Sequence, residues 1–127
     1  MNMIDSAFSA HEKALGVRSQ RMELLSRNIA NADTPNFKAR DIDFRRALKD
    51  TLASTLQTSH RSHITNSDEE SRSRAQYRVP FNVAIDGNTV ELSVEQAKFG
   101  QYAAEYQTTL SILENRISGI RKALRGD

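Results

Sequence analysis

Hydrophobic residues in the first part of the chain recur with the 3.6-residue period of an α-helix, from Ile4 to about Asn31. One stripe contains Ile4, Phe8, Leu15, Met22, Leu25 and Ile29. A second stripe directly beside it contains Met3, Ala7, Ala10, Ala14, Val17 and Leu24. His11 and Arg18 interrupt the first stripe, and polar residues in such stripes often fix the register of helix pairs. Because the combined face is wider than a two-stranded seam uses, it predicts contacts with further partners.

The most regular hydrophobic pattern lies near the other end of the chain. Its positions alternate between steps of four and three, which is a sustained heptad pattern: Phe99, Ala103, Tyr106, Leu110, Leu113, Ile117, Ile120 and Leu124. Ser93, followed by Gln96, has the form of a capping box, so we expect a long helix to begin there. Gly126 is expected to end it, after basic residues that complement the helix dipole.

Between these two helices the sequence predicts one further short helix. Its apolar residues recur every four positions: Phe44, Leu48, Leu52 and Leu56. Either Asp41 or Asp43 is placed to cap its first turn. The following residues, 57–74, are polar and rich in Ser, and we interpret them as a linker or surface loop.

From Phe81 to Val94 the hydrophobic period changes to two, on either side of Asp86-Gly87. Asp-Gly is a favoured tight turn, so the pattern predicts a β-hairpin. An extended arm along neighbouring subunits would explain the same alternation. The pattern itself does not separate these alternatives.

The first long helix has a clear stop signal. Asn28 and Asn31 are poor residues for a helix interior, and Pro35 cannot continue a helix. Pro35 also restricts Thr34 to an extended conformation. The chain is therefore expected to turn at about residues 32–34.

These patterns predict a mainly α protein. Long N- and C-terminal helices pair as a coiled-coil-like stem, and a short second helix, a polar loop and a small β-hairpin or extended arm lie between them. We divide the chain into an N-terminal helix over 1–34, a middle part over 35–92 and a C-terminal helix over 93–127.

Composition and charge exclude several functions. The 127 residues contain 18 Lys and Arg against 16 Asp and Glu, without the basic clusters that nucleic-acid binding needs. The absence of Cys excludes disulfides and thiolate metal sites. His60 and His63 lie near acidic residues, but their polar loop lacks the scaffold of a zinc site. We therefore expect no catalytic, cofactor-binding or metal-binding residues, and no small-molecule substrate.

The stop signal is more specific than a helix end requires. Its Ser26-x-Asn28-Ile-Ala-Asn run, followed by Thr34 and the Phe37-Lys38 pair, resembles the N-terminal signature of the flagellar axial proteins, the rod and hook family. The following residues, 39–44, are similar to the proximal-rod type within the flagella basal body rod protein family. Asn36 stands where many members carry Gly. The chain also lacks the Gln-x-x-Tyr-x-x-Asn signature of longer members, as the proximal-rod type does.

The resemblance implies a structural subunit that assembles helically with copies of itself into a hollow, torque-transmitting rod. Its implied partners are other rod proteins, the basal-body membrane ring with its rod adaptor, and the flagellar export apparatus. The implied location is the periplasm-spanning rod. The first residues show no secretory signal pattern, so export without a cleaved signal peptide is expected.

A second hypothesis follows from the heptads alone, namely a small cytoplasmic helical adaptor or chaperone that binds partner helices. It leaves the signature around Asn28 to Lys38 unexplained. Under the first hypothesis, the residues expected to make assembly contacts are Ile4, Phe8, Leu15, Met22, Leu25, Asn28, Ile29, Asn31, Thr34, Pro35, Phe37, Phe99, Tyr106, Leu110, Leu113, Ile117, Ile120 and Leu124.

Overall fold

The computed structural model describes residues 3–56, 75–80 and 82–126. Its elements follow the order α1 (Met3–Ala30), β1 (Arg40–Asp41), α2 (Phe44–Leu56), β2 (Gln76–Tyr77) and α4 (Leu92–Arg125). The mainly α class, the two long terminal helices and the short middle helix are therefore confirmed. The predicted loop over 57–74 lies outside the described residues.

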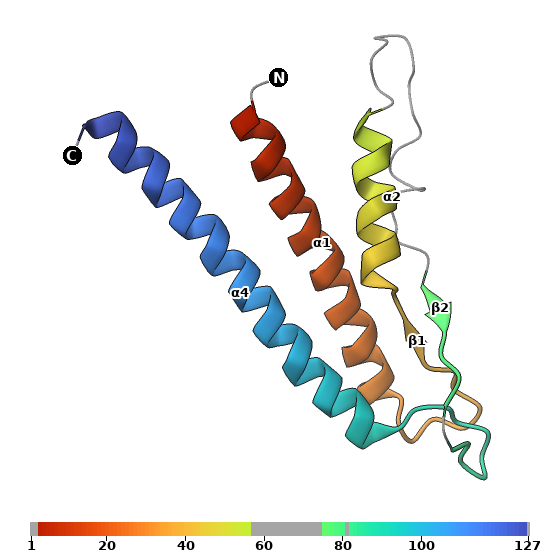
Figure 1. Cartoon of the computed structure of the whole chain (residues 1–127). Coiled ribbons are helices and arrows are strands. Elements are labelled where there is room, and N and C mark those ends of the chain that lie inside the picture. Colours follow the sequence, from red (N-terminus) through yellow and green to blue (C-terminus); the bar gives the residue numbers. More distant parts are fainter. Residues whose placement is uncertain (1–2, 57–74, 81, 127) are drawn as a thin grey trace.

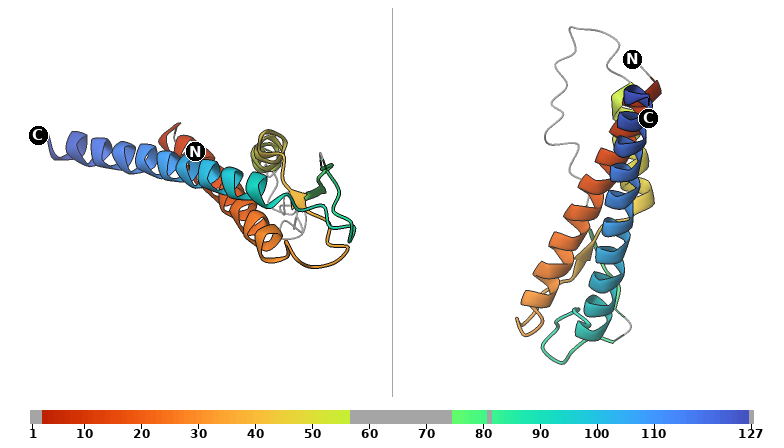
Figure 2. Two further views of the ribbon diagram at one scale, coloured as in Figure 1. Left: turned by 90° about the horizontal axis from the view of Figure 1, so that it is seen from below. Right: turned by 90° about the vertical axis from the view of Figure 1, so that its left-hand side faces the viewer.

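The two long helices run antiparallel, and α1 lies between α4 and α2 (Figure 1). The N-terminal end of α1 and the C-terminal end of α4 lie at the same end of the molecule. In Figure 1 the two helices diverge from the opposite end, where α1 ends and α4 begins, and the first view of Figure 2 shows the last turns of α4 extending beyond α1. Since α4 has 34 residues and α1 has 28, the last turns of α4 lie apart from α1.

The core lies between α1, α2 and the residues that precede α2. Val17, Ile42 and Ala47 are buried together, and Leu24 and Phe44 pack against them. Val17 and Leu24 belong to the second stripe of α1, and both pack within the chain against the cluster that contains Ile42 and Ala47. Part of this stripe is therefore covered inside the subunit, and the expectation that the wide face contacts further partners stays a prediction.

The small sheet is antiparallel and joins distant segments. Arg40 pairs with Tyr77 and Asp41 with Gln76. The predicted β-hairpin over 81–94 was wrong for its strands, because no strand lies within 82–91. Its turn is correct, since the Gly87 N–H donates to the carbonyl of Ala84 at 2.9 Å. The backbone of this segment bonds instead to the chain after α1, through Asn36 and Phe37.

The helix ends confirm some predicted caps and correct one. The Asp43 carboxylate accepts a hydrogen bond from the Arg46 N–H at 3.2 Å, so Asp43 caps α2, whereas Asp41 does not. Gly126 ends α4 in the left-handed conformation. The capping box at Ser93 was wrong: the N-cap of α4 is Glu91, two residues earlier, and it makes no side-chain cap.

Candidate functional site

The signature residues form a compact turn at the end of α1. The Asn31 side chain donates to the carbonyl of Arg27 at 2.7 Å, and its oxygen accepts from the Thr34 hydroxyl at 3.2 Å. The Thr34 and Phe37 N–H groups then continue the turn by donating to the carbonyls of Asn31 and Thr34. The last carbonyls of a helix lack partners within the helix, and these bonds supply some of them.

Asn88 joins this turn to the chain just before α4. Its buried side-chain NH₂ lies 2.8–2.9 Å from three carbonyl oxygens, those of Asn31, Ala32 and Thr34. Its side-chain oxygen accepts from the Val90 N–H at 2.7 Å. One amide therefore binds the turn that follows α1 and orients the chain that leads into α4.

Two residues in the left-handed conformation lie in direct contact here. Asn36 has a φ of 60° and Gly87 a φ of 78°. A Cβ atom at Gly87 would lie 2.5 Å from Asn36 Oδ1, so no larger residue fits without displacement. Asn is the side-chain-bearing residue that best tolerates this conformation, which explains how Asn36 replaces the Gly of the signature.

Backbone pairing completes what we call the helix joint, residues 31–39 together with 84–91. The Asn36 N–H donates to the carbonyl of Asp86 and the Thr89 N–H to that of Phe37, both at 3.0 Å. The Thr89 hydroxyl oxygen accepts from the Ala39 N–H at 2.8 Å. These hydrogen bonds hold the chain after α1 against the chain before α4.

Asn28 links the joint to α4. Its side chain donates to the Arg40 carbonyl at 2.8 Å and accepts from the Arg40 N–H at 3.1 Å. The same NH₂ group lies 3.1 Å from Glu95 Oε2 in α4, where both side chains are buried. Asn28 therefore forms hydrogen bonds both with the backbone of β1 and with a carboxylate of α4.

A group of four charged residues, the charged clasp, lies above the joint: Arg21, Asp41, Arg78 and Glu95. Asp41 accepts from Arg21 at 2.9 and 3.1 Å and from Arg78 Nη2 at 2.8 Å. Arg78 also forms an ion pair with Glu95, whose side chain is fully buried. The two positive and two negative charges balance, as buried charges require. They join α1, β1, the chain after β2 and α4.

The clasp perturbs its own protonation. Burial acts to raise the pKa of Asp41, but hydrogen bonds from Arg21, the Ile42 N–H and Arg78 outweigh it and hold that pKa below its ordinary value. The guanidinium of Arg21 lies 3.8 Å from the centre of the Tyr102 ring, and burial raises the pKa of this tyrosine. Asp41 is thereby kept as the carboxylate that its partners need.

The structure places the predicted contact residues in different environments. Leu25 and Asn28 are buried inside the subunit. Ile4 lies in the first turns of α1. Partly buried are Phe8, Leu15, Met22, Ile29, Asn31, Phe37, Phe99, Tyr106, Leu110, Leu113 and Ile120. Exposed are Thr34, Pro35, Ile117 and Leu124. Their role as assembly contacts stays a prediction.

Arg18 makes its polar contact within the subunit. It forms an ion pair with Glu105 of α4, and its guanidinium lies 4.2 Å from the centre of the Phe44 ring. This contact fixes α1 against both α4 and α2.

Sequence reasoning missed most residues of the joint and the clasp. Asn88 and Thr89 follow the Asp-Gly turn, and polar residues are common in such loops, so their polarity did not mark them as functional. Arg78 and Glu95 carry no local signal, because their partners lie 17 to 67 residues away. The signature had selected Asn28 and, within the joint, Asn31, Thr34, Pro35 and Phe37, whereas Asp41 was considered only as a helix cap.

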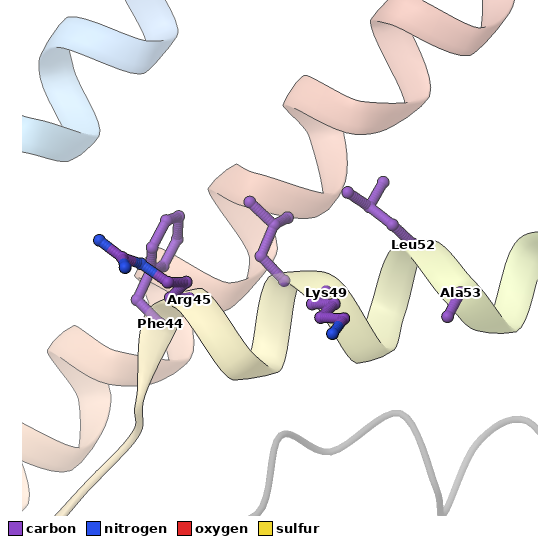
Figure 3. Close-up of a pocket in the computed structure, with 6 residues that line it drawn as sticks. Phe44, Arg45, Lys49, Leu52 and Ala53 are labelled. Carbon is purple, nitrogen blue, oxygen red and sulfur yellow. The ribbon is translucent and has the colours of Figure 1, made fainter.

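A hollow on the surface of α2 is lined by Phe44, Arg45, Leu48, Lys49, Leu52 and Ala53 (Figure 3). All six residues come from this one helix, and no carboxylate, hydroxyl or imidazole is among them. Within the described residues, no three His, Cys, Asp or Glu side chains gather where they would hold a metal ion. His60 and His63 lie outside these residues. None of the described helices has the length and apolarity needed to cross a membrane.

Comparison with known proteins places the signature and the whole chain in one family. A family model described as "Flagella basal body rod protein" matches residues 8–38. The chain is 44% identical to the flagellar basal body rod protein FlgB of Aeromonas hydrophila, with 97% of this chain and 96% of the relative covered. It is 44% identical to FlgB of Cereibacter sphaeroides, covering 92% of each chain, and 36% identical to FlgB of Escherichia coli, covering 98% and 97%. The chain therefore belongs to the FlgB family of flagellar basal body rod proteins.

Proposed function

We propose that this chain is a structural subunit of the proximal rod of the bacterial flagellar basal body. It assembles helically into the hollow shaft that transmits torque. The observation that carries the proposal is the similarity to FlgB proteins over nearly the whole chain, including both long helices and the joint between them. The adaptor hypothesis is not favoured, because it does not explain the signature around Asn28 to Lys38.

The fold supports a mechanical role. The helix joint and the charged clasp fix the ends of α1 and α4 to each other, whereas the other ends of the helices diverge. Apolar residues remain exposed on the distal half of α4, among them Ile117 at 37% and Leu124 at 83%. A rigid base with uncovered apolar helices suits a subunit that completes its burial on neighbours.

The partners that we propose are other rod proteins, the membrane ring with its rod adaptor, and the export apparatus. We further propose that the chain is not an enzyme and that it is exported without a cleaved signal peptide. The terminal helices are expected to become fully ordered on docking, because isolated helices are only marginally stable. A dilute monomer whose circular dichroism showed both terminal helices fully formed and melting cooperatively would contradict this ordering.

The test of the function is deletion of the gene, followed by electron microscopy of isolated basal bodies. Rods should be missing from the deletion strain and restored by the intact chain. The double substitution Ile117→Glu and Leu124→Glu should not restore them, because it places charge on the exposed apolar face. Val79→Glu, at a position 90% exposed outside the long helices, is the matched control and should restore rods. Normal rods in the deletion strain would reject the proposal and favour the cytoplasmic adaptor.

A further inference from the structure

The distal end of α4 combines an apolar seam with a distinct charge pattern. Its seam residues are Leu113, Ile117, Ile120 and Leu124, of which Leu124 is the most exposed. Arg116 flanks the seam on one side and Arg121 on the other, and Lys122 and Arg125 follow. All four basic side chains are exposed, and no ion pair is found for any of them within the described residues.

These positions have a defined meaning in heptad numbering. With Leu113 and Ile120 at d and Ile117 and Leu124 at a, Arg116 occupies g and Arg121 occupies the following e. Residues at e and g face the e and g residues of a partner helix and decide which partner is accepted. The positive charge at Arg116 and Arg121 therefore indicates which charge the partner helix carries at the positions that face them.

A second copy of the same segment does not satisfy this pattern. In a parallel, in-register pair, Arg116 of one copy would face Arg121 of the other, and two like charges would meet on each side of the seam. A membrane surface fits the positive charge, but interfacial helices bury a broad apolar face, often with Trp or Phe. The residues after Tyr106 contain no aromatic side chain and form a narrow seam.

We propose that residues 113–125 dock an amphipathic helix of another protein that carries Asp or Glu at the e and g positions facing Arg116 and Arg121. This inference rests on the proposed function and deepens it, because it assigns a charge to the neighbour at this end of the subunit. The partner contributes apolar a and d residues that cover Ile117 and Leu124. Its carboxylates pair with Arg116 and Arg121.

The test uses two synthetic heptad-repeat peptides that share the same a and d residues and differ only in carrying Glu or Lys at e and g. Fluorescence anisotropy with the full chain should show binding of the Glu peptide that is about tenfold tighter and weakens with salt. The double substitution Arg116→Glu and Arg121→Glu should reverse this preference. Arg45→Glu with Arg46→Glu, the same charge change at exposed positions of α2, should leave it unchanged.

Equal affinity for both peptides, binding of neither, or preference for the Lys peptide would overturn the inference. Binding to vesicles of anionic phospholipid without binding to the Glu peptide would overturn it in favour of a membrane surface. A cell-based arm separates it from the proposed function. If the intact chain and the Arg116→Glu, Arg121→Glu variant both restore rods in the deletion strain, the inference fails while the rod function stands. If the deletion strain forms rods by itself, the rod function fails.

Discussion

Two asparagine amides and one carboxylate hold the backbone where the long helices meet. Asn88 contacts three carbonyl oxygens at the end of α1, and Asn28 pairs with both backbone groups of Arg40. Glu95 lies between Asn28 and Arg78 with no exposed surface. Because the apolar core is small, these polar residues determine how the ends of the long helices are positioned. Removing one of them would leave a buried polar partner without its hydrogen bond, which costs free energy.

Replacement of Glu95 by Gln tests the clasp at the level of one charge. Removing one member of a buried ion pair leaves the other uncompensated, so we expect the free energy of unfolding to fall by about 3 kcal/mol. Urea denaturation followed by circular dichroism measures this change. Glu114→Gln, an exposed position on the same helix, should change it by less than about 0.5 kcal/mol. Similar values for the two variants would contradict a structural role for Glu95.

Gly87→Ala tests the close approach inside the joint. The new methyl group would meet Asn36 Oδ1, and Ala would have to adopt a positive φ, so we expect a loss of about 1–2 kcal/mol. Gly100→Ala is the matched control, because nothing lies within 4 Å of its Cβ position in α4. There Ala should stabilise the helix by about 0.5–1 kcal/mol. Thermal melts with opposite shifts would confirm the prediction, and parallel shifts would reject it.

Among the helices, α2 and α4 differ in how their first turns are stabilised. The first turn of α2 is capped by the Asp43 side chain, whereas α4 follows Glu91 without a side-chain cap. The first turn of α4 is instead held by the clasp, because Glu95 lies there. Tertiary contacts therefore replace local capping at the helix where the sequence shows the stronger capping motif.

Alanine at each candidate cap distinguishes the two mechanisms. Asp43→Ala should lower the free energy of unfolding by about 1 kcal/mol, since it removes the acceptor of the Arg46 N–H. Ser93→Ala should change it by less than about 0.5 kcal/mol, because Ser93 is exposed and caps nothing. Chemical denaturation of both variants is the measurement. A larger loss at Ser93 would restore the capping-box interpretation.

Across the whole molecule, the charged clasp connects four separate segments of the chain. Arg21 belongs to α1, Asp41 to β1 and Glu95 to α4, while Arg78 follows β2. Because the charges lie on four separate parts of the chain, the clasp forms only when the fold closes. Its protonation should therefore act on global stability.

The pH dependence follows from the lowered pKa of Asp41. Since this group binds a proton less readily in the folded state, it stabilises the fold above its ordinary pKa of about 3.9. That contribution is lost as the pH falls from about 4 through the lower folded-state pKa. Melting temperatures measured between pH 6 and pH 2.5 should drop more steeply for the intact chain than for Asp41→Asn. Equal slopes would show that Asp41 does not contribute to the acid sensitivity.

Much of the fold was predictable from local patterns. Both long helices, the short helix from Phe44, the turn at Asp86-Gly87 and the left-handed end at Gly126 follow from periodicity and turn chemistry. The signature around Asn28 also pointed correctly to the family. The packing of Val17 and Leu24 beside α2 was missed, because an i+4 pattern predicts that α2 exists but not which face of α1 it packs against.

Local sequence patterns were enough to predict the helices, most of their ends and the family, because these depend on neighbours a few residues apart. The start of α4, the pairing of β1 with β2 and the contact of residues 82–91 with the chain after α1 became visible only in the folded chain. The tertiary structure also decided that Arg78 meets Asp41 across 37 residues and that Asn88 reaches Thr34 across 54. A buried charge or amide pairs with a group that the packing of the helices places next to it. The spacing of residues along the sequence does not indicate which group that is.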